Sequence, residues 1–154
     1  MEAKLDGNDT GNQRYPVREP IRVRWKDLDP LGHVNNAVYF TYFEMGRVAY
    51  MRALGHVDLG AAQPSESFPF IIAKLSCEFL APVGLEDELE IALSCTQLGS
   101  KSFQFRYRLT RLVDGREVAR GDSVQVYYDY PTKRSAPLPQ EFRARVEALE
   151  AQAR

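Results

Sequence analysis

The stretch KDLDPLGHVNNAVYFTYFEMGR, residues 26–47, decides how the rest of this 154-residue chain is interpreted. It begins with a polar segment holding two aspartates, a proline, a glycine, a histidine and two asparagines, and continues into an aromatic run. The polar residues are turn formers, and Asn35 or Asn36 is a good N-cap. The run after them predicts a helix from about Asn36 to Leu54, with Gly55 at its C-terminal end.

The predicted helix carries few polar side chains. Between Ala37 and Leu54 these are Thr41, Glu44, Arg47 and Arg52, together with the hydroxyls of Tyr39, Tyr42 and Tyr50. A helix that is apolar around most of its circumference is buried on most sides. In a short domain, the simplest way to bury such a helix is to wrap a sheet around it, and we expect that arrangement.

Alternating apolar residues predict five strands for this sheet. The first precedes the helix, with Val17, Ile21, Val23 and Trp25 on alternate positions. The other four follow a loop over residues 55–69, and their alternating sets run Ile71 to Phe79, Leu89 to Cys95, Phe103 to Leu109, and Val124 to Tyr128. The tail, residues 140–154, predicts a short amphipathic C-terminal helix.

The connections between strands define the class. The segment 98–102 and the pair Asp114-Gly115 predict tight turns, so neighbouring strands are antiparallel and the class is α+β. We expect residues 1–16 to be a flexible N-terminal segment and residues 17–154 to form one domain. Because one sheet curled around one helix leaves an edge unpaired, we also expect at least a dimer.

Composition excludes several classes of function. The formal net charge is −1, which gives no general affinity for nucleic acid. The N-terminus lacks the pattern of a signal peptide, and no apolar run approaches the roughly 20 residues of a membrane span. Cys77 and Cys95 lie in strand-like runs without metal-ligand spacing, which favours free thiols. These features predict a cytoplasmic protein.

The polar segment itself has three interpretations. The first is a turn followed by a helix cap. The second is a calcium loop, but Leu31 and Val38 stand where two essential oxygen ligands belong. His33 also lacks the partners of a zinc site, so we expect no metal.

The third interpretation is catalytic. Asp29 lies a few residues before a helix N-terminus whose backbone N–H groups can stabilise an oxyanion. A carboxylate there can attack an acyl carbonyl or deprotonate a water that does so. The same helix dipole also stabilises an inert carboxylate cap, so the residues alone leave both interpretations open.

The segment DLDPLGHVNNAVYFTYFE resembles the signature of the hotdog-fold acyl-CoA thioesterases of the 4-hydroxybenzoyl-CoA thioesterase type. That signature is D-x-D-x-x-G-H-V-N-N-x-x-Y, with an acidic residue five positions further on. The matching residues are Asp27, Asp29, Gly32, His33, Val34, Asn35, Asn36, Tyr39 and Glu44. The similarity extends over roughly residues 18–145, and it implies a long helix wrapped by a five-stranded antiparallel sheet.

The resemblance implies catalytic roles. Asp29 would be the catalytic carboxylate, acting as nucleophile or as general base, and the residues do not decide between these routes. The backbone N–H groups near Asn36 and Ala37 would polarise the thioester carbonyl. His33 and Asn36 would line the site. The reaction would release a free acid and CoA without a cofactor.

The resemblance also implies residues that bind the substrate. Gly32, Ala37, Tyr39 and Glu44 would lie at the acyl site, Glu44 in a supporting role. Lys101 and Ser102 occupy the turn that meets the CoA phosphates in the benzoyl branch, although Gly99 and Ser100 stand where arginines can occur. The loop from His56 to Phe68 is a second candidate for pocket lining.

Two alternatives remain beside an acyl-CoA thioesterase acting as a homodimer or homotetramer. One is a thioesterase of the same fold that accepts acyl carrier protein through a basic patch of Arg106, Arg108 and Arg111. The other is a non-catalytic module that binds acyl-CoA.

Overall fold

The computed structural model describes residues 3–4, 14–55 and 69–153. In chain order its elements are β1 (Ala3–Lys4), β2 (Val17–Arg22), the 3-10 turn η1 (Trp25–Asp27), α1 (Val38–Ala53), β3 (Phe70–Phe79), β4 (Glu88–Leu98), β5 (Ser102–Arg111), β6 (Arg116–Asp129), β7 (Arg134–Ser135) and α3 (Gln140–Gln152). Most of the segment 1–16 and the candidate loop 56–68 lie outside the described residues.

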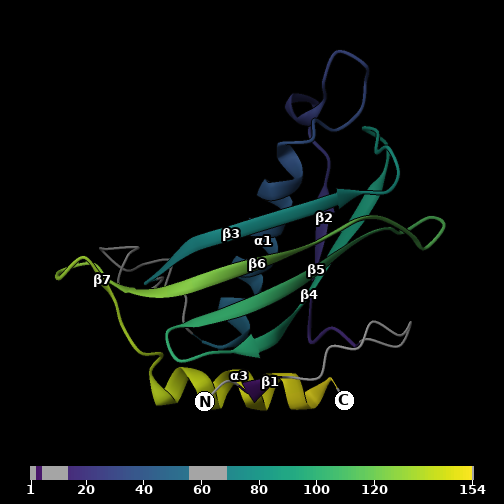
Figure 1. Cartoon of the computed structure of the whole chain (residues 1–154). Coiled ribbons are helices and arrows are strands. Elements are labelled where there is room, and N and C mark those ends of the chain that lie inside the picture. Colours follow the sequence, from purple (N-terminus) through teal and green to yellow (C-terminus); the bar gives the residue numbers. More distant parts are fainter. Residues whose placement is uncertain (1–2, 5–13, 56–68, 154) are drawn as a thin grey trace.

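An antiparallel sheet curls around α1, and α3 lies across one end of the molecule (Figure 1). The sheet runs β1-β4-β5-β6-β3, with β2 also pairing with β4 and the short β7 with β6. The five long strands, the central helix and the C-terminal helix confirm the predicted α+β architecture. No helix among the described residues is long and apolar enough to cross a membrane.

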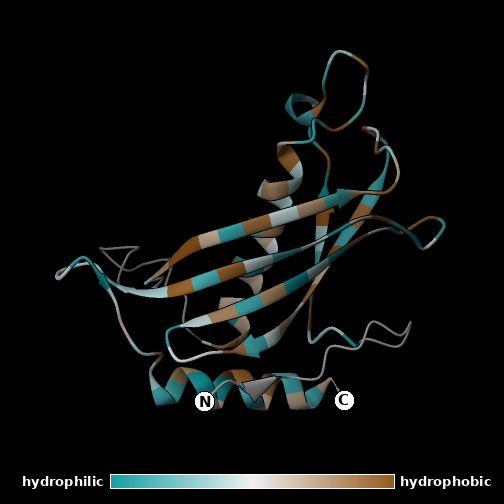
Figure 2. Cartoon of the chain, viewed as in Figure 1, coloured by the Kyte–Doolittle hydropathy of each residue, from teal (hydrophilic) through white to brown (hydrophobic). Residues whose placement is uncertain are grey.

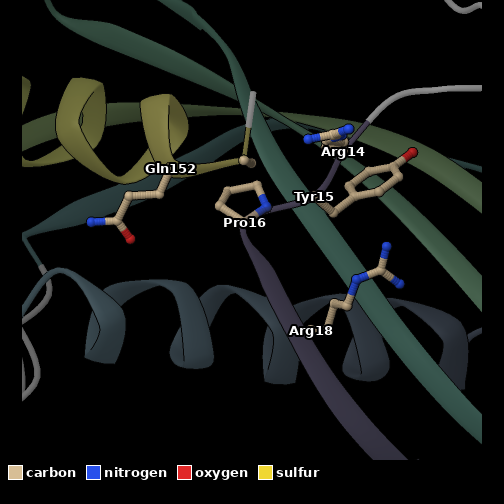
Figure 3. A pocket seen from close by; sticks show the side chains of 6 residues that line it. Arg14, Tyr15, Pro16, Arg18 and Gln152 are labelled. Carbon is tan, nitrogen blue, oxygen red and sulfur yellow. The ribbon is translucent and has the colours of Figure 1, made fainter.

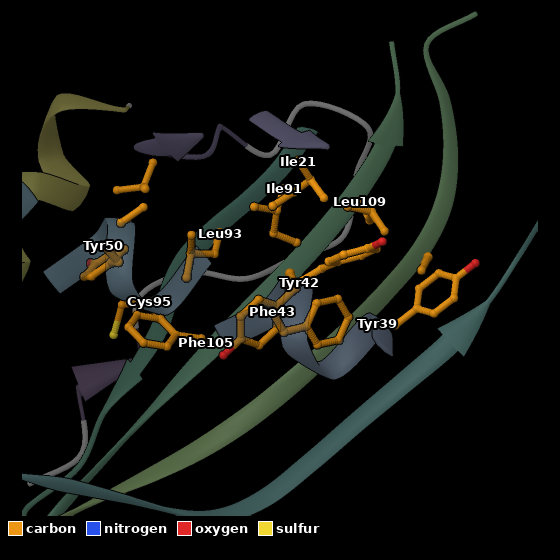
Figure 4. Close-up of a cluster of buried hydrophobic side chains, with 14 of the residues drawn as sticks. Ile21, Tyr39, Tyr42, Phe43, Tyr50, Ile91, Leu93, Cys95, Phe105 and Leu109 are labelled. Carbon is orange, nitrogen blue, oxygen red and sulfur yellow. The ribbon is translucent and has the colours of Figure 1, made fainter. Parts of the chain in front are cut away.

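The core lies between α1 and the inner face of the sheet, where apolar and polar residues alternate along the strands (Figure 2). Tyr42, Phe43 and Tyr50 of α1 lie in this core (Figure 4) and are at most 1% exposed. Phe43 stacks on Tyr107 of β5 with ring centroids 4.4 Å apart. Gly121 of β6 pairs with Tyr107, and the ring of Phe43 lies against it. The helix is therefore buried by aromatic packing, as its sequence predicts.

The start of α1 differs in detail from the prediction. The helix begins at Val38, and its N-cap is Ala37, which has no capping side chain. Asn35, predicted as a possible cap, instead accepts a hydrogen bond from the Ala37 N–H at 2.9 Å. Its side-chain oxygen thus caps the turn before the helix, two residues ahead of the N-cap position.

The first long strand ends sooner than its alternating pattern predicts. Strand β2 stops at Arg22, and the chain turns into η1 at Trp25. Val23 is buried as expected, but Trp25 is 78% exposed, so its placement on the inner face is wrong. The carboxylate of Asp27 accepts hydrogen bonds from Arg24, which fixes the turn and removes Trp25 from the strand.

A bulge in β3 changes which of its residues share a face. The register against β6 shifts between Ile72 and Lys74. Beyond the bulge Leu75 packs against the core, whereas Ile71 is 39% exposed. The prediction that Ile71 and Ala73 face inward together with Leu75 is wrong, because one extra residue inverts the alternation.

Strand β6 presents polar side chains to the helix. Ser123 and Gln125 are each 1% exposed and pair with the inward-facing phenylalanines of β5. The apolar side of this strand, formed by Val124, Val126 and Tyr128, is its outer face, and these side chains are only half-buried. A polar stripe therefore runs inside the barrel-like sheet.

Helix α3 closes one end of the fold through a buried carboxylate. Glu150 is 8% exposed, and its Oε1 accepts hydrogen bonds from the Tyr50 hydroxyl and from the Cys95 N–H, both at 2.6 Å. Phe142 packs on Phe70 and Phe103 with ring centroids about 5 Å away. The end of α1 and the β4–β5 hairpin are thus joined through α3.

The two cysteines are free thiols, as predicted. Cys95 is buried, and Cys77 is half-buried on the inner side of β3. Burial raises the pKa of the Cys77 thiol to about 11, so the group is protonated at neutral pH. This thiol is therefore a poor nucleophile.

Candidate active site

The two aspartates of the polar segment have different environments. Asp27 is 1% exposed and receives hydrogen bonds from the Arg24 N–H, from the Arg24 guanidinium and from the Tyr42 hydroxyl at 3.0 Å. Burial by itself raises the pKa of Asp27, but the bonds from Arg24 and Tyr42 together lower it below its usual value. Asp27 therefore joins η1 to α1.

Asp29 organises the next turn and keeps one oxygen available. Its Oδ1 accepts the N–H groups of Leu31 at 2.9 Å and His33 at 3.3 Å. Its backbone also pairs with His33 O and Gly32 N. Among the described residues no hydrogen bond reaches Oδ2, so this oxygen is available to a ligand.

Gly32 makes this turn possible. Its φ angle of +79° lies in the left-handed region, which a side chain at Cβ disfavours. Nothing lies within 4 Å of a Cβ placed there, so the requirement comes from the backbone and not from packing. Gly32 shapes the loop and does not line the cleft.

Asp29 opens onto a cleft of about 370 Å³. Its lining comes from the start of α1 and from the end of β3 with the segment after it: Asp29, Val34, Asn36, Tyr39, Phe79, Leu80, Ala81 and Pro82. Tyr39 meets Phe79 edge to face with ring centroids 5.0 Å apart. The cleft thus sets one carboxylate and one amide side chain against a mostly apolar wall.

Of the two backbone donors predicted at the helix start, one is already occupied. The N–H of Ala37 is occupied by Asn35 Oδ1, and the N–H of Val38 donates to Asn35 O. The N–H of Asn36 donates to no acceptor in the part of the chain that the structure describes. Of the two predicted amides, Asn36 is therefore the available one.

Two other predicted site residues lie outside the cleft lining. The His33 side chain is exposed, and its observed bonds to Asp29 come from its backbone. Glu44 is exposed on α1, and no ion pair joins it to Arg47. Within one chain, neither side chain contributes to the cleft.

Lys101 and Ser102 lie at the opposite end of the sheet from Asp29. They form the β4–β5 turn, which packs beside α3 through a bond from Leu138 N to Ser100 O (Figure 1). The other end of β5, at Arg111, lies by Pro82 of the cleft, and ten residues of strand span about 30 Å. The two predicted CoA contacts therefore do not reach the cleft of their own chain.

The far wall of the cleft was not among the residues predicted individually. Phe79, Leu80, Ala81 and Pro82 close it from the strand opposite α1. The N–H groups of Leu80 and Ala81 both donate to Val118 O, which holds this wall against β6. The local signal in the sequence was Pro82, three residues after the end of β3.

A second hollow, of about 350 Å³, lies beside the end of α3 (Figure 3). It is lined by Arg14, Tyr15, Pro16, Arg18, Gln152 and Ala153. Arg18 is already paired with Glu90 at 2.7 Å and lies over the Tyr15 ring. These lining residues include no carboxylate, so the hollow does not share the chemistry of the Asp29 cleft.

The described residues contain no cluster of three His, Cys, Asp or Glu side chains suited to a metal ion. What the site does contain is a helix start, a carboxylate with an available oxygen, and an apolar wall. A long helix wrapped by an antiparallel sheet is the hotdog fold, which solved thioesterase structures share.

The chain belongs to the Thioesterase-like superfamily, whose family model matches residues 23–146. The acyl-CoA thioester hydrolase YbgC of Escherichia coli O6:H1 is 33% identical over 92 residues, which are 60% of this chain and 67% of that protein. The long-chain acyl-CoA thioesterase FadM of E. coli K12 is 28% identical over 133 residues, 86% of this chain and 98% of FadM.

The fold is shared with solved structures. A thioesterase from Thermus thermophilus, in complex with coenzyme A and zinc, superposes with a TM-score of 0.78 and 34% identity. The match covers 90% of this chain and 97% of the Thermus protein.

Proposed function

We propose that this protein hydrolyses an acyl-CoA thioester to a free acid and CoA at the Asp29 cleft. One observation carries the proposal: Asp29 Oδ1 is bound by two backbone N–H groups, while its Oδ2 is available in a cleft with an apolar wall. The bonds to Oδ1 hold the carboxylate in place without occupying the oxygen that reacts.

The chemistry follows from this geometry. Oδ2 either attacks the thioester carbon, which expels the CoA thiolate and forms an anhydride that water opens, or takes a proton from a water that attacks directly. In both routes negative charge develops on the carbonyl oxygen. The Asn36 N–H at the start of α1 is suited to stabilise that charge, and the helix dipole has the right sign.

The apolar wall supports an acyl group as the substrate part that enters the cleft. Val34, Leu80 and Ala81 offer no charge and no side-chain hydrogen bond. An acyl group there excludes water from Asp29, which strengthens its electrostatic interaction with the reacting carbon. YbgC and FadM, by their names, act on acyl-CoA, which agrees with this choice.

Acyl carrier protein is the less favoured partner. The three arginines predicted to form a basic patch are each near a carboxylate: Arg106 pairs with Asp122, Arg108 with Glu117, and Arg111 with Asp114. A patch that is neutralised in this way attracts an acidic carrier protein weakly. This observation favours CoA over the carrier.

We further propose that the functional unit contains at least two chains, paired along β3. This strand ends the sheet, so one row of its backbone groups has no strand partner among the described residues. Its side chains Ile71 and Ile72 are 39% and 42% exposed. An unpaired apolar edge is a template for a second copy. A neighbouring chain is also what would bring Lys101 and Ser102 to an Asp29 cleft.

A panel of acyl-CoAs of different length and aromaticity tests the activity, with released CoA measured in wild type, Asp29→Asn and Asp29→Ala. Asp122→Asn is the matched control, because it makes the same change on the outer face of β6. We expect hydrolysis to fall at least about 100-fold in both Asp29 variants. Undiminished hydrolysis in both would reject the assignment of Asp29.

Two further measurements separate the remaining alternatives. A single turnover in oxygen-18 water that labels the Asp29 carboxyl identifies the anhydride route. Light scattering measures the number of chains, and a purely monomeric active enzyme would contradict pairing along β3. Binding of acyl-CoA without any hydrolysis would identify the non-catalytic module instead.

A further inference from the structure

Four tyrosines are buried in the described part of the chain, and the hydroxyl of one of them has no partner there. Three of these hydroxyls bond to another side chain, namely those of Tyr42, Tyr50 and Tyr107. The fourth residue, Tyr39, is 3% exposed, and its hydroxyl forms no hydrogen bond with any described residue. Buried tyrosine hydroxyls usually have a partner, so the exception at Tyr39 requires a physical explanation.

The hydroxyl of Tyr39 opens into the Asp29 cleft. Its oxygen has no partner among the described residues, yet it is not one of the partnerless polar atoms there that are sealed from water. The oxygen therefore belongs to the small exposed part of the residue. Tyr39 lines the cleft of about 370 Å³, so the cleft is the space that this part reaches. Figure 4 shows the Tyr39 oxygen directed away from the rings of Tyr42 and Phe43.

Contacts with two other rings hold the side chain of Tyr39 in place. Phe79 meets it edge to face, with ring centroids 5.0 Å apart and an angle of 88° between the ring planes. The ring of Tyr42 lies 6.2 Å away, and Tyr42 is itself held by its bond to Asp27. A donor that is already fixed in a cleft loses little freedom when it binds a ligand. The Tyr39 hydroxyl is therefore pre-organised for recognition.

The surroundings of this hydroxyl favour an uncharged acceptor. Burial raises the pKa of Tyr39, and the nearby Cys77 and Asp87 raise it further. The hydroxyl is therefore protonated at neutral pH and can donate a hydrogen bond. The carboxyl group of Asp29 lines the same cleft, and that of Asp87 lies near the hydroxyl, so a further negative charge is disfavoured there.

An acyl group that enters the cleft covers the hydroxyl of Tyr39. The side chains of Val34, Leu80 and Ala81 in the lining offer no hydrogen bond to it. A chain of carbon and hydrogen alone displaces water from the hydroxyl and leaves the donor unsatisfied, which is unfavourable. A chain that carries an oxygen beside the hydroxyl restores the lost bond. The cleft therefore distinguishes the two kinds of chain.

From these relationships we infer that Tyr39 determines specificity, and that its hydroxyl selects an acyl chain bearing an uncharged oxygen, as in an oxoacyl or a hydroxyacyl group. This inference rests on the proposed function, because the acyl group has to occupy the Asp29 cleft. It adds the substrate class and the residue that recognises it. The two kinds of group share an acceptor oxygen, and the experiment separates them.

Six-carbon chains provide a matched set of probes that are short enough for a cleft of about 370 Å³. Hexanoyl-CoA is the reference, and its 3-oxo, 4-oxo and 5-oxo derivatives move one acceptor along the chain. The 3-hydroxy derivative tests a hydroxyl group, and 5-carboxypentanoyl-CoA tests a negative charge. In the corresponding thioethers a methylene group replaces the thioester carbonyl. They bind without being hydrolysed, so their affinities do not depend on thioester reactivity.

The experiment measures kcat/KM for the thioesters and the affinity for the thioethers by calorimetry. In wild type we expect at least one oxo or hydroxy chain to exceed hexanoyl by at least about tenfold in both measurements, and the carboxylate chain to be the weakest. Tyr39→Phe keeps the ring and removes the hydroxyl, so it is expected to lower this ratio about tenfold. Tyr130→Phe, the same change at a residue that is 42% exposed and outside the cleft lining, is expected to keep the ratio.

Melting temperatures test the premise that the hydroxyl has no partner in the fold. Tyr39→Phe is expected to melt like wild type, whereas Tyr42→Phe loses its bond to Asp27 and is expected to melt lower. A drop in Tyr39→Phe as large as that in Tyr42→Phe would overturn the inference.

Two results of the binding and rate measurements would also overturn it. One is a wild-type preference for the hexanoyl or the carboxylate chain, and the other is an equal loss for all chains in Tyr39→Phe. If no thioester is hydrolysed, the proposed activity fails, and the thioether affinities still decide whether Tyr39 selects the oxygen.

Discussion

The hydroxyl of Tyr42 donates a hydrogen bond to Oδ2 of Asp27 at 3.0 Å, which ties the first acid of the D-x-D motif to the central helix. The second acid, Asp29, has its available oxygen in the cleft. Asp27 is therefore a structural carboxylate, whereas Asp29, two positions further on, is the candidate catalytic one. This division predicts opposite phenotypes for the same substitution at the two positions.

Asp29→Asn is expected to remove activity and keep stability, because an amide oxygen can still accept the Leu31 and His33 N–H groups. Asp27→Asn is expected to lower the free energy of unfolding by about 2 kcal/mol, because it weakens bonds to a buried acceptor. Urea unfolding measures the stability of both variants, and the rate of acyl-CoA hydrolysis measures their activity. Loss of stability in Asp29→Asn with normal stability in Asp27→Asn would contradict it.

The pH dependence of stability follows from the lowered pKa of Asp27. A carboxylate whose pKa is lower in the folded state stabilises the fold above its unfolded pKa, near 3.8, and this contribution is lost as pH falls through the folded value. The stability difference between wild type and Asp27→Asn should therefore be full at neutral pH and shrink in acid. Urea unfolding at about pH 7 and about pH 3 measures it. A difference that grows in acid would show that the sign is wrong.

Gly121→Ala is expected to destabilise the fold by about 2–4 kcal/mol. A Cβ at this position would collide with the backbone oxygen of Ser76 and lie 2.6 Å from the Phe43 ring, which is itself held on Tyr107. Gly84→Ala is the control, since the nearest atom to its Cβ is 4.0 Å away. Thermal unfolding of both variants tests this, and equal melting temperatures would refute the packing argument.

Glu150→Leu is expected to loosen the contact of α3 with the rest of the fold. It leaves the Tyr50 hydroxyl and the Cys95 N–H without their shared acceptor, which costs about 2–4 kcal/mol. Glu150→Gln keeps an acceptor oxygen and should therefore lose less stability than Glu150→Leu. Glu147→Gln, at an exposed position of the same helix, serves as the control. Hydrogen exchange at Cys95 reports the effect locally, and unchanged protection in Glu150→Leu would disprove it.

Cys77 is expected to react slowly with alkylating reagents. Its pKa of about 11 exceeds the ordinary thiol value of 9.0 by about two units, so it holds about a hundredfold less thiolate at neutral pH. The alkylation rate should rise with pH up to about 11. Mass spectrometry of Cys77 against a free thiol peptide measures this, and a rate that levels off near pH 9 would exclude the raised pKa.

Local sequence patterns predicted the class of fold, and the resemblance of residues 26–47 to the thioesterase signature made Asp29 the candidate acid. A helix that is apolar around its circumference has to be enclosed, and strands with tight turns between them can enclose it only as an antiparallel sheet. The turn chemistry around Gly32 is also local, because a left-handed backbone position depends on the residue that occupies it. These features depend on neighbours in sequence, and so they could be predicted.

What only the tertiary structure decided depends on contacts between distant segments. The bulge after Ile72 set which side of β3 faces α1, and no local pattern marks it. The wall of the cleft from Phe79 to Pro82 comes within reach of Asp29 only because β3 crosses the start of α1. Lys101 lies about 30 Å from the Asp29 cleft, because the two are at opposite ends of β5.

The polar stripe of β6 shows the difference most directly. By its sequence the strand has one apolar side and one side with Ser123 and Gln125. A strand of an antiparallel sheet usually packs its apolar side against the core. The register with β5 instead places Ser123 and Gln125 inside, where Ser123 bonds with the Tyr107 hydroxyl that also accepts a bond from Arg47. Alternation tells that a strand has two faces, but only packing against the helix decides which face is buried.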